Sequence, residues 1–350
     1  MLPDAVRLLV EAGRQAPSAD NSQPWRMVWD GRRLSLAYRE PAHGSLFQQH
    51  DIATRLAMGA ATENIMQLSE PLGLSRETAA SATETLDASY LSVSVPPETR
   101  VASELRHHPV FGRHTNRFAF RADRLPDVIC DEIERASERS ARVKVLVEDR
   151  EREEAAALVR VASEVRFRMR RVHEWFMSTL RFTPDDVNRG DGLDVRTLHL
   201  PPGGPMLLRA VRDWRRMELL NRIGAYRAFA RIEAHPLRSA PAIVAIQAKR
   251  DLDGALAGGQ LMERVWSMLN SRGVAVHPYY VVPDILDRIE RHEDLPARFG
   301  PEIAGFPDNV RGFFGVAPGN ALYMLLRIGY PTRSPVRARR RPVEDVCPNG

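Results

Sequence analysis

The sequence predicts an α+β protein in which mixed sheets are flanked by helices. Apolar residues recur at helical spacing in several long segments, and short strand-like apolar runs stand between them. The chain has 350 residues, of which 43% are hydrophobic and 27% are charged. This length and composition are ordinary for a globular enzyme with two domain-sized units or one large body.

Each part of the chain carries its own series of helices and strands. Helices are predicted where apolar residues recur every three or four positions, and strands where they alternate between Gly- or Pro-containing turns. The N-terminal elements are a helix at 3–15, a hairpin at 26–38, a helix at 51–72, a weakly patterned Ser/Thr/Ala-rich segment at 75–88 and a strand at 90–95. After a connection at 97–115 come helices at 126–138, 150–180, 209–221 and 252–270, and strands at 143–147, 242–247, 274–276 and 321–328. A Pro/Gly/Asp-rich stretch at 183–205 is long enough to act as a lid.

A loose internal repetition accompanies this order of elements. A long helix that bears Ala and Gly, ends at glycine and leads into a strand occurs over Ala60–Val95 and again over Gly258–Val276. The repetition alone does not establish a duplication.

Composition and charge restrict the classes of function. No apolar run approaches the roughly 18–20 residues of a membrane span, and no secretion signal is visible, so no membrane partner is expected. Cys130 and Cys347 suggest no disulfide framework, and no His/Cys/Asp set has the spacing of metal ligands. The net charge is only +5, and the most concentrated basic stretch is the tail 333–341, so no nucleic-acid partner is expected. A cytoplasmic protein fits these features.

The first motif with chemical content is the loop at residues 16–25, Ala-Pro-Ser-Ala-Asp-Asn-Ser-Gln-Pro-Trp. Its amide and hydroxyl groups suit a flat polar heterocycle, while Pro17 and Trp25 hold the shape of the loop. The same residues also suit a helix that ends and runs into a hairpin.

Two further motifs are basic. Arg113, Thr115 and Arg117 alternate along the segment, so in an extended chain their side chains point to one side. Two guanidinium groups that flank a hydroxyl suit a phosphate or an anionic ring edge. The third motif is the arginine run at 337–341, followed by Pro342. Each basic motif is also compatible with a solvated turn or tail.

Taken together, the three motifs resemble those of the nitroreductase family of flavin enzymes. That family has an Arg-x-Ser/Thr-x-Arg/Lys segment, then a Pro-Ser-x-x-Asn-x-Gln-Pro-Trp loop, and a basic pair before a proline near its end. Residues 113–117, 17–25 and 339–342 match these motifs in turn. The order differs from that of a standard member, because here the loop precedes the basic segment.

This departure is similar to the fused tandem, Acg-type FMN-binding subgroup. In ordinary members each FMN site takes its basic segment from one subunit and its Asn/Gln loop from the other. The resemblance therefore implies a nitroreductase-like fold with two fused lobes, residues 1–105 and 106–350, in a single-chain pseudo-dimer. One flavin site would be complete and the other degenerate. We expect a monomer, with further self-association left open.

The resemblance also assigns cofactor residues position by position. Arg113 and Thr115, helped by Arg339 and Arg341, are expected at the ribityl-phosphate end of FMN. Arg117 is expected at the N1/O2 edge of the isoalloxazine, where a cation stabilises the anionic reduced flavin. The residues expected along the ring are Pro17, Ser18, Ala19, Asn21 and Gln23 of the loop, and His277 and Pro278 beyond the strand at 274–276. No catalytic acid or base is assigned.

The function implied by the resemblance is two-electron oxidoreduction of a small organic molecule. NAD(P)H acts as a transient co-substrate that reduces FMN, and a nitroaromatic, a quinone-like compound or a natural-product intermediate accepts the electrons. A flavin covered by the 183–205 stretch would instead indicate a non-catalytic FMN-binding or sequestering protein. The third interpretation is a basic-tailed nucleic-acid or protein adaptor that binds no flavin.

Overall fold

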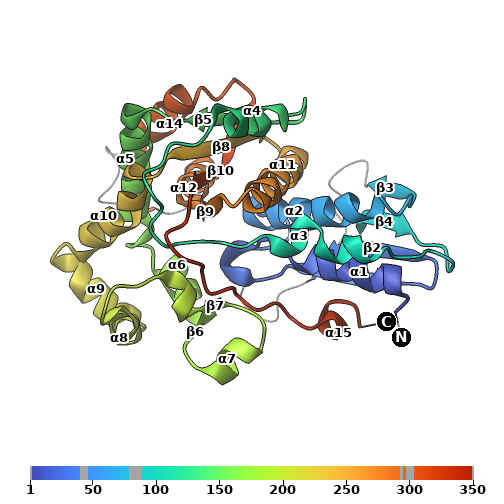
Figure 1. Ribbon diagram of the computed structural model, residues 1–350. Helices are drawn as coiled ribbons and strands as arrows, with labels where there is room; N and C mark the ends of the chain where they lie inside the picture. The colour runs from blue at the N-terminus through green and yellow to red at the C-terminus, as the bar shows by residue number, and fades with distance from the viewer. Residues whose placement is uncertain (1, 40–45, 79–88, 292–294, 297–302, 349–350) are drawn as a thin grey trace.

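Two four-stranded antiparallel sheets, each covered by helices, build the protein (Figure 1). The computed structural model describes residues 2–39, 46–78, 89–291, 295–296 and 303–348, so most of the segment at 75–88 lies outside the described residues. The predicted α+β class is confirmed, but the prediction of mixed sheets is wrong. In the described chain, parallel pairing is confined to the short strands β6 (Leu180–Arg181) and β7 (Leu193–Asp194) and to a bridge between Thr115 and Val276.

The first sheet is built on a tight hairpin formed by its strands β1 and β2. Its strand order is β1-β2-β4-β3, and the turn after β1 is closed by Asp30, whose Oδ1 accepts the backbone N–H groups of Arg32 and Arg33. A turn this short permits only antiparallel pairing. The elements are α1 (Asp4–Arg14), β1 (Trp25–Trp29), β2 (Arg33–Tyr38), α2 (Ile52–Ser69), β3 (Arg76–Thr78) and β4 (Ser89–Ser94).

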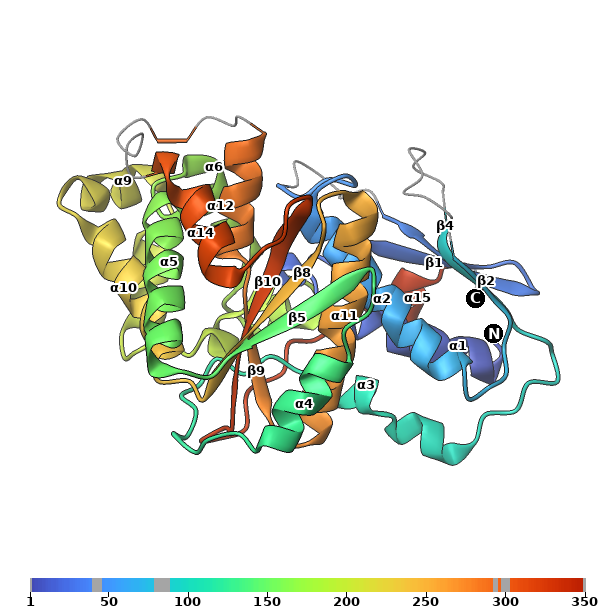
Figure 2. The ribbon, with the colours of Figure 1, turned by 90° about the horizontal axis from the view of Figure 1, so that it is seen from above.

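The second sheet is buried on both faces. Figure 2 shows α11 on one side of the sheet and α5, α12 and α14 on the other. Along β8, Val244 and Ile246 pack toward α11, whereas Ile243 and Ala245 pack toward α5 and α12. This explains why β8 is a continuous apolar run. The elements are α4 (Asp127–Arg135), β5 (Ala141–Leu146), α5 (Asp149–Arg166), β8 (Ala242–Lys249), α11 (Leu252–Ser271), β9 (Ala275–Tyr279), α12 (Val281–Glu290), α14 (Phe306–Phe314) and β10 (Asn320–Gly329).

The two sheets repeat one arrangement. The chain order α1-β1-β2-α2-β3-β4 recurs as α4-β5-β8-α11-β9-β10, and in both sheets the neighbours are the first, second, fourth and third of these strands. Helices α5 to α10 are inserted between β5 and β8, and α12 and α14 between β9 and β10. The long helices α2 and α11 pack against each other at the centre of the molecule.

The insertion differs most from the sequence prediction. The helix expected at 150–180 is two helices, because the chain is extended at Met169 (φ −92°, ψ 109°). The helix expected at 209–221 breaks at Asp213, whose side chain accepts the N–H of Arg215 and caps a new helix. The inserted helices are α6 (Arg170–Thr179), α7 (Pro184–Asn188), α8 (Gly204–Ala210), α9 (Trp214–Arg222) and α10 (Ala225–Arg238). No helix was predicted from the sequence at α10, α12 or α14.

The C-terminal tail returns to the first sheet. Beyond β10 the chain runs back across the molecule to α15 (Val343–Val346), which packs against α1 and β1 (Figure 1). This path carries the arginine run past the loop that follows α1. The lobe boundary at residue 105 stays a prediction.

Candidate functional site

The loop between α1 and β1 has a strained backbone. Asp20, Asn21 and Gln23 adopt φ values of 49°, 57° and 53°, in the left-handed region. Aspartate and asparagine enter this region more readily than other residues that carry a side chain, so the strain lies mainly at Gln23. The loop is braced by Ser18, whose Oγ accepts the N–H of Gln23 at 3.0 Å. Strain of this kind persists where the surroundings enforce it, and it gathers at binding sites.

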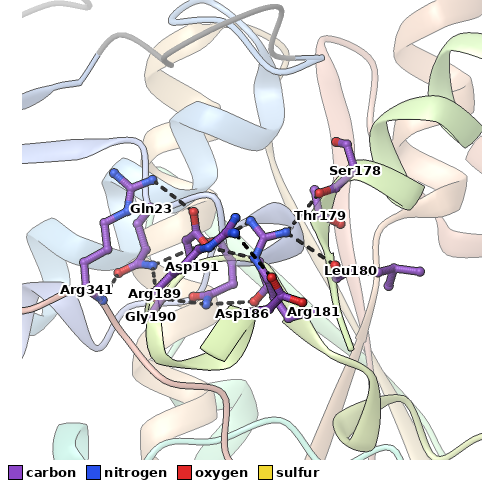
Figure 3. A network of polar contacts seen from close by, with 12 residues as sticks. Gln23, Ser178, Thr179, Leu180, Arg181, Asp186, Arg189, Gly190, Asp191 and Arg341 are labelled. Carbon is purple, nitrogen blue, oxygen red and sulfur yellow. Dashed lines mark hydrogen bonds and ion pairs between the residues drawn. The ribbon is translucent and has the colours of Figure 1, made fainter. Parts of the chain in front are cut away.

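Two amide side chains of this loop, those of Asn21 and Gln23, lie inside the protein. Asn21 and Gln23 are only 4% and 1% exposed. The Asn21 amide donates to the carbonyls of Gly192 and Arg339, each at 3.0 Å, and the Gln23 amide donates to the carbonyl of Gly190 at 2.8 Å. Gln23 Oε1 accepts the backbone N–H of Arg341 at 3.0 Å (Figure 3). The loop therefore binds the tail and the 183–205 stretch together.

Part of the 183–205 stretch lies directly on the loop. The cover, residues 188–192, is held by the two loop amides and by Asp191, which pairs with Arg181 at 2.8 Å and lies 3.8 Å from Arg341 (Figure 3). A Cβ atom on Gly190 would lie 2.4 Å from the carbonyl oxygen of Arg340, so only glycine fits there. Any ligand that uses the amides of Asn21 and Gln23 must first displace this cover.

Arg113 is buried against α11. Its Nε lies 3.1 Å from Glu263 Oε1, its guanidinium stacks on the Trp266 ring at 4.8 Å, and its Nη2 donates to the carbonyl of Gln15 at the end of α1. The side chains of Arg113 and Glu263 are 2% and 0% exposed. The first basic segment thus reaches the start of the loop.

Arg340 joins the same place from the tail. Its guanidinium donates to the carbonyls of Gln15 and Ala16 at 3.3 and 3.1 Å and to Asn21 Oδ1 at 2.5 Å. Burial and the neighbouring Arg113 lower the pKa of Arg340 to about 9. Burial raises the pKa of Glu263 to about 7 against the attraction of Arg113. Arg14 also lies here, because its Nη1 donates to the carbonyl of Arg341 and its charge further lowers the pKa of Arg340. We call Arg14, Arg113, Arg340 and Glu263 the basic cluster.

A second group of partly buried ionisable side chains, those of Arg117, Asp20 and His277, lies at the other end of the loop. Arg117 donates to the carbonyl of Thr197 at 3.4 Å, and burial lowers its pKa while Asp20 opposes that shift. Asp20 accepts the indole N–H of Trp175 at 2.9 Å, and burial raises its pKa. The ring centroids of His277 and Tyr279 lie 4.5 Å apart, with the rings tilted by 53°. Burial lowers the pKa of His277 far below its usual value, helped by Arg327 and Arg117.

The other residues predicted to bind the cofactor are spread over a strand edge, the tail and the loop itself. Thr115 pairs through its backbone with Val276, at the start of the strand that carries His277 and Pro278. Arg339 is exposed and donates to Asn188 at 2.7 Å. Pro17 and Ala19 are half-buried within the loop.

Sequence reasoning missed three members of the basic cluster: Arg14, Arg340 and Glu263. The arginine run showed that the tail is basic but did not show which arginine turns inward. Arg14 and Glu263 lie on helices, where a charged residue most often faces solvent, so no local pattern pointed to them.

Outside this loop, a cavity, a metal site and a membrane-spanning helix are the other features that could indicate a function. A cavity of about 360 Å³ lies between the start of α2, α12 and α14, and none of the predicted cofactor residues lines it. Within the described ranges, no three His, Cys, Asp or Glu side chains are grouped in a way that would hold a metal ion. Among the helices that the structure describes, none has both the length and the apolar character needed to cross a bilayer.

Comparison with known proteins gives one sequence relative and several distant structures. No protein-family model matches the chain. The chain is 28% identical over 292 residues to the uncharacterized protein MT1398 of Mycobacterium tuberculosis. The match covers 77% of this chain and 38% of that protein, so the chain spans well under half of the relative's length.

Several of the solved structures with some likeness carry the name nitroreductase. The FMN-dependent nitroreductase NfnB from Mycobacterium smegmatis, in complex with NADPH, is 17% identical with a TM-score of 0.37. The likeness covers 69% of this chain and 95% of NfnB. A nitroreductase-like family protein from Bacillus cereus is 14% identical with a TM-score of 0.37, covering 71% of this chain and 95% of that protein. At these identities and TM-scores the likeness carries no argument about function, which must come from the chain's own residues.

Proposed function

We propose that this chain is an FMN-dependent oxidoreductase with a nitroreductase-like fold. The observation that carries the proposal is the meeting of three segments far apart in the sequence. Arg113 of the mid-chain segment and Arg340 of the tail both donate to the carbonyl of Gln15, and Arg340 also donates to Asn21 of the loop. These are the segments whose motifs resemble those of the flavin enzymes.

The charge at this meeting point suits the phosphate end of FMN. Of the three arginines in the basic cluster, only Arg113 pairs with Glu263, and the buried Nε atoms of Arg14 and Arg340 have no hydrogen-bond acceptor among the described residues. Uncompensated buried cations are costly, and a phosphate dianion neutralises them with charge-assisted hydrogen bonds. The residues therefore fit the group.

The other end of the loop suits the ring. Arg117 brings a positive charge to the same side of the loop as Asp20 and His277, where it would lie at the N1/O2 edge of the isoalloxazine. When bound, FMN supplies two-electron chemistry between NAD(P)H and a small organic acceptor of the nitroaromatic or quinone class, or a natural-product intermediate. The protein binds and orients the cofactor, and no side chain of the chain has to act as acid or base.

The fused-lobe arrangement is part of the same proposal. The repeated order of helices and strands in the two sheets supports two lobes that meet as the subunits of a dimer would. The loop belongs to the first lobe, while Arg113 and Arg117 precede the first helix of the second. One chain thus forms one complete flavin site and acts as a monomer in the cytoplasm.

Titration of the purified chain with FMN tests the proposal. We expect binding of about one FMN per chain, followed by anaerobic bleaching of the flavin absorbance by NADPH and its recovery with a quinone. Failure to bind FMN at concentrations of about 1 mM, a weak affinity by any standard, overturns the proposal. A ratio near two overturns only the single-site arrangement.

A second candidate, a non-catalytic FMN-binding or sequestering protein, is favoured by the cover. The carbonyls of Gly190 and Gly192 accept hydrogen bonds from the amides of Asn21 and Gln23, so the cover closes over the loop, and a flavin held beside it would be shielded from nicotinamide. The anaerobic experiment separates the two functions, because a sequestered flavin stays yellow with excess NADPH. Dithionite, a small reductant, serves as the control that the flavin itself is reducible.

A further inference from the structure

One arm of the insertion, which is joined to α5 through α10, is strongly basic. Helices α8, α9 and α10, residues 204–238, lie at the end of the molecule that is remote from both termini (Figures 1 and 2). This arm holds eight arginines against three acidic residues, a net charge of +5, which equals the net charge of the whole chain. The rest of the protein is therefore electrically balanced, and the excess positive charge is concentrated in the arm.

The arginines of the arm are exposed and lack counterions. None of them forms a salt bridge with any residue that the structure describes. Two of the three acidic residues of the arm have other partners: Asp213 caps α9, and Glu233 pairs with Arg166 of α5 at 2.7 Å. The third, Glu218, is exposed and leaves the arm strongly positive. The eight exposed arginines are Arg209, Arg212, Arg215, Arg216, Arg222, Arg227, Arg231 and Arg238.

The same arm exposes large apolar side chains. Its inner face is already packed, since Met217 and Val211 are buried in a small core shared with α6. The outer apolar side chains are not needed for that core. Of the seven large apolar residues that are exposed in the described chain, five lie in the arm: Met206, Leu207, Leu219, Ile223 and Ile232, from 44% to 81% exposed.

We propose that this arm docks on an anionic lipid surface. Arginines attract acidic headgroups, and the exposed Met, Leu and Ile side chains of the same arm enter the boundary with the acyl chains. A second copy of the arm would repel the first through its charge. Single-stranded nucleic acids are held by exposed aromatic rings, whereas the exposed apolar residues of the arm are aliphatic. The expectation of no membrane partner rests on the lack of an apolar span, which surface docking does not require.

Sedimentation of the full-length protein with lipid vesicles tests the proposal. We expect the protein to bind vesicles that contain phosphatidylglycerol and not to bind vesicles of pure phosphatidylcholine. Added salt should release the bound protein. The double variant Leu219→Ser/Ile223→Ser and the double variant Arg222→Glu/Arg231→Glu should each weaken partitioning about tenfold or more. Circular dichroism checks that the variants remain folded.

Matched changes outside the arm serve as controls. Val128→Ser replaces an apolar side chain that is 58% exposed on α4, and Arg100→Glu/Arg139→Glu reverses two exposed charges elsewhere. Both controls should bind vesicles as the parent does. Equal loss in the controls, binding to neutral vesicles, or no binding to anionic vesicles overturns the proposal. So does a dimer in analytical ultracentrifugation that Leu219→Ser/Ile223→Ser dissociates, or DNA binding that survives this variant without vesicle binding.

Discussion

Gly59 of α2 and Gly259 of α11 hold equivalent positions at the crossing of the two long central helices. A Cβ on Gly59 would lie 2.1 Å from the carbonyl oxygen of Leu256, and a Cβ on Gly259 would lie 2.2 Å from that of Leu56. In each helix the leucine precedes its glycine by three residues. The contact is therefore reciprocal, as in a two-fold interface between like subunits.

Replacing Gly59 by alanine should destabilise the protein. The obstructing atoms are backbone, which cannot move aside as a side chain can, so we expect a loss of about 2 kcal/mol or more in the free energy of unfolding. Chemical denaturation measures it. Gly312→Ala on α14 is the control, because nothing lies within 4 Å of its Cβ and alanine favours the helix by up to about 1 kcal/mol. Equal stability of Gly59→Ala and the parent would contradict the close crossing.

Arg340→Gln should weaken FMN binding more than Arg339→Gln. Arg340 lies in the basic cluster, whereas Arg339 is exposed and bonded to Asn188. Loss of a charge-assisted hydrogen bond worth about 1.5–3 kcal/mol raises the dissociation constant by about 10- to 100-fold. The change at Arg339 should be less than about threefold. Flavin fluorescence quenching gives both constants, and the reverse ranking would assign the phosphate to Arg339.

The FMN affinity should depend on pH through Glu263. The pKa of this carboxyl is raised to about 7, and a bound phosphate raises it further. Binding then takes up a proton, so affinity falls as the pH rises through about 7. Glu263→Gln should remove this fall and leave only the titration of the phosphate itself. Parallel pH profiles of the parent and the variant would exclude Glu263 from the phosphate site.

The motifs of the candidate site were recognisable in the sequence, but the buried charged residues between them were not. The loop at 16–25, Arg113 and the arginine run were recognisable as motifs, and the structure brings all three to the carbonyl of Gln15. Local patterns do not encode which way a charged side chain turns on a helix, so Arg14 and Glu263 were missed. The inward-facing arginine of the tail could not be predicted for a related reason. The three consecutive arginines at 339–341 look alike in sequence, and which one turns inward depends on how α15 packs against α1 and β1.

The fold was predictable where periodicity was strong. Helix α2 and strand β8 follow their apolar patterns, because burial dominates both. The breaks at Met169 and Asp213 were not visible, since the apolar spacing continues through each of them. Sheet direction was also missed, because it depends on which distant strands become neighbours. The inserted helices had separated β5 from β8 in the sequence.

The stability of the protein should fall in mild acid through His277. Its Nδ1 is buried with no hydrogen-bond partner among the described residues, and burial, Arg327 and Arg117 lower its pKa well below 6.5. Below pH 6.5 the unfolded chain gains a proton at this histidine that the folded chain does not accept. The folded state therefore loses up to about 1.4 kcal/mol per pH unit relative to the unfolded state. Denaturation of the parent and of His277→Gln at pH 7.5 and about pH 5.5 measures this, and we expect the parent to lose more stability.

His107→Gln, at an exposed position, is the matched control and should lose as much stability as the parent. Equal losses in the parent and His277→Gln would show that His277 accepts a proton in the folded protein, and hence that solvent or an anion reaches it beside Arg117.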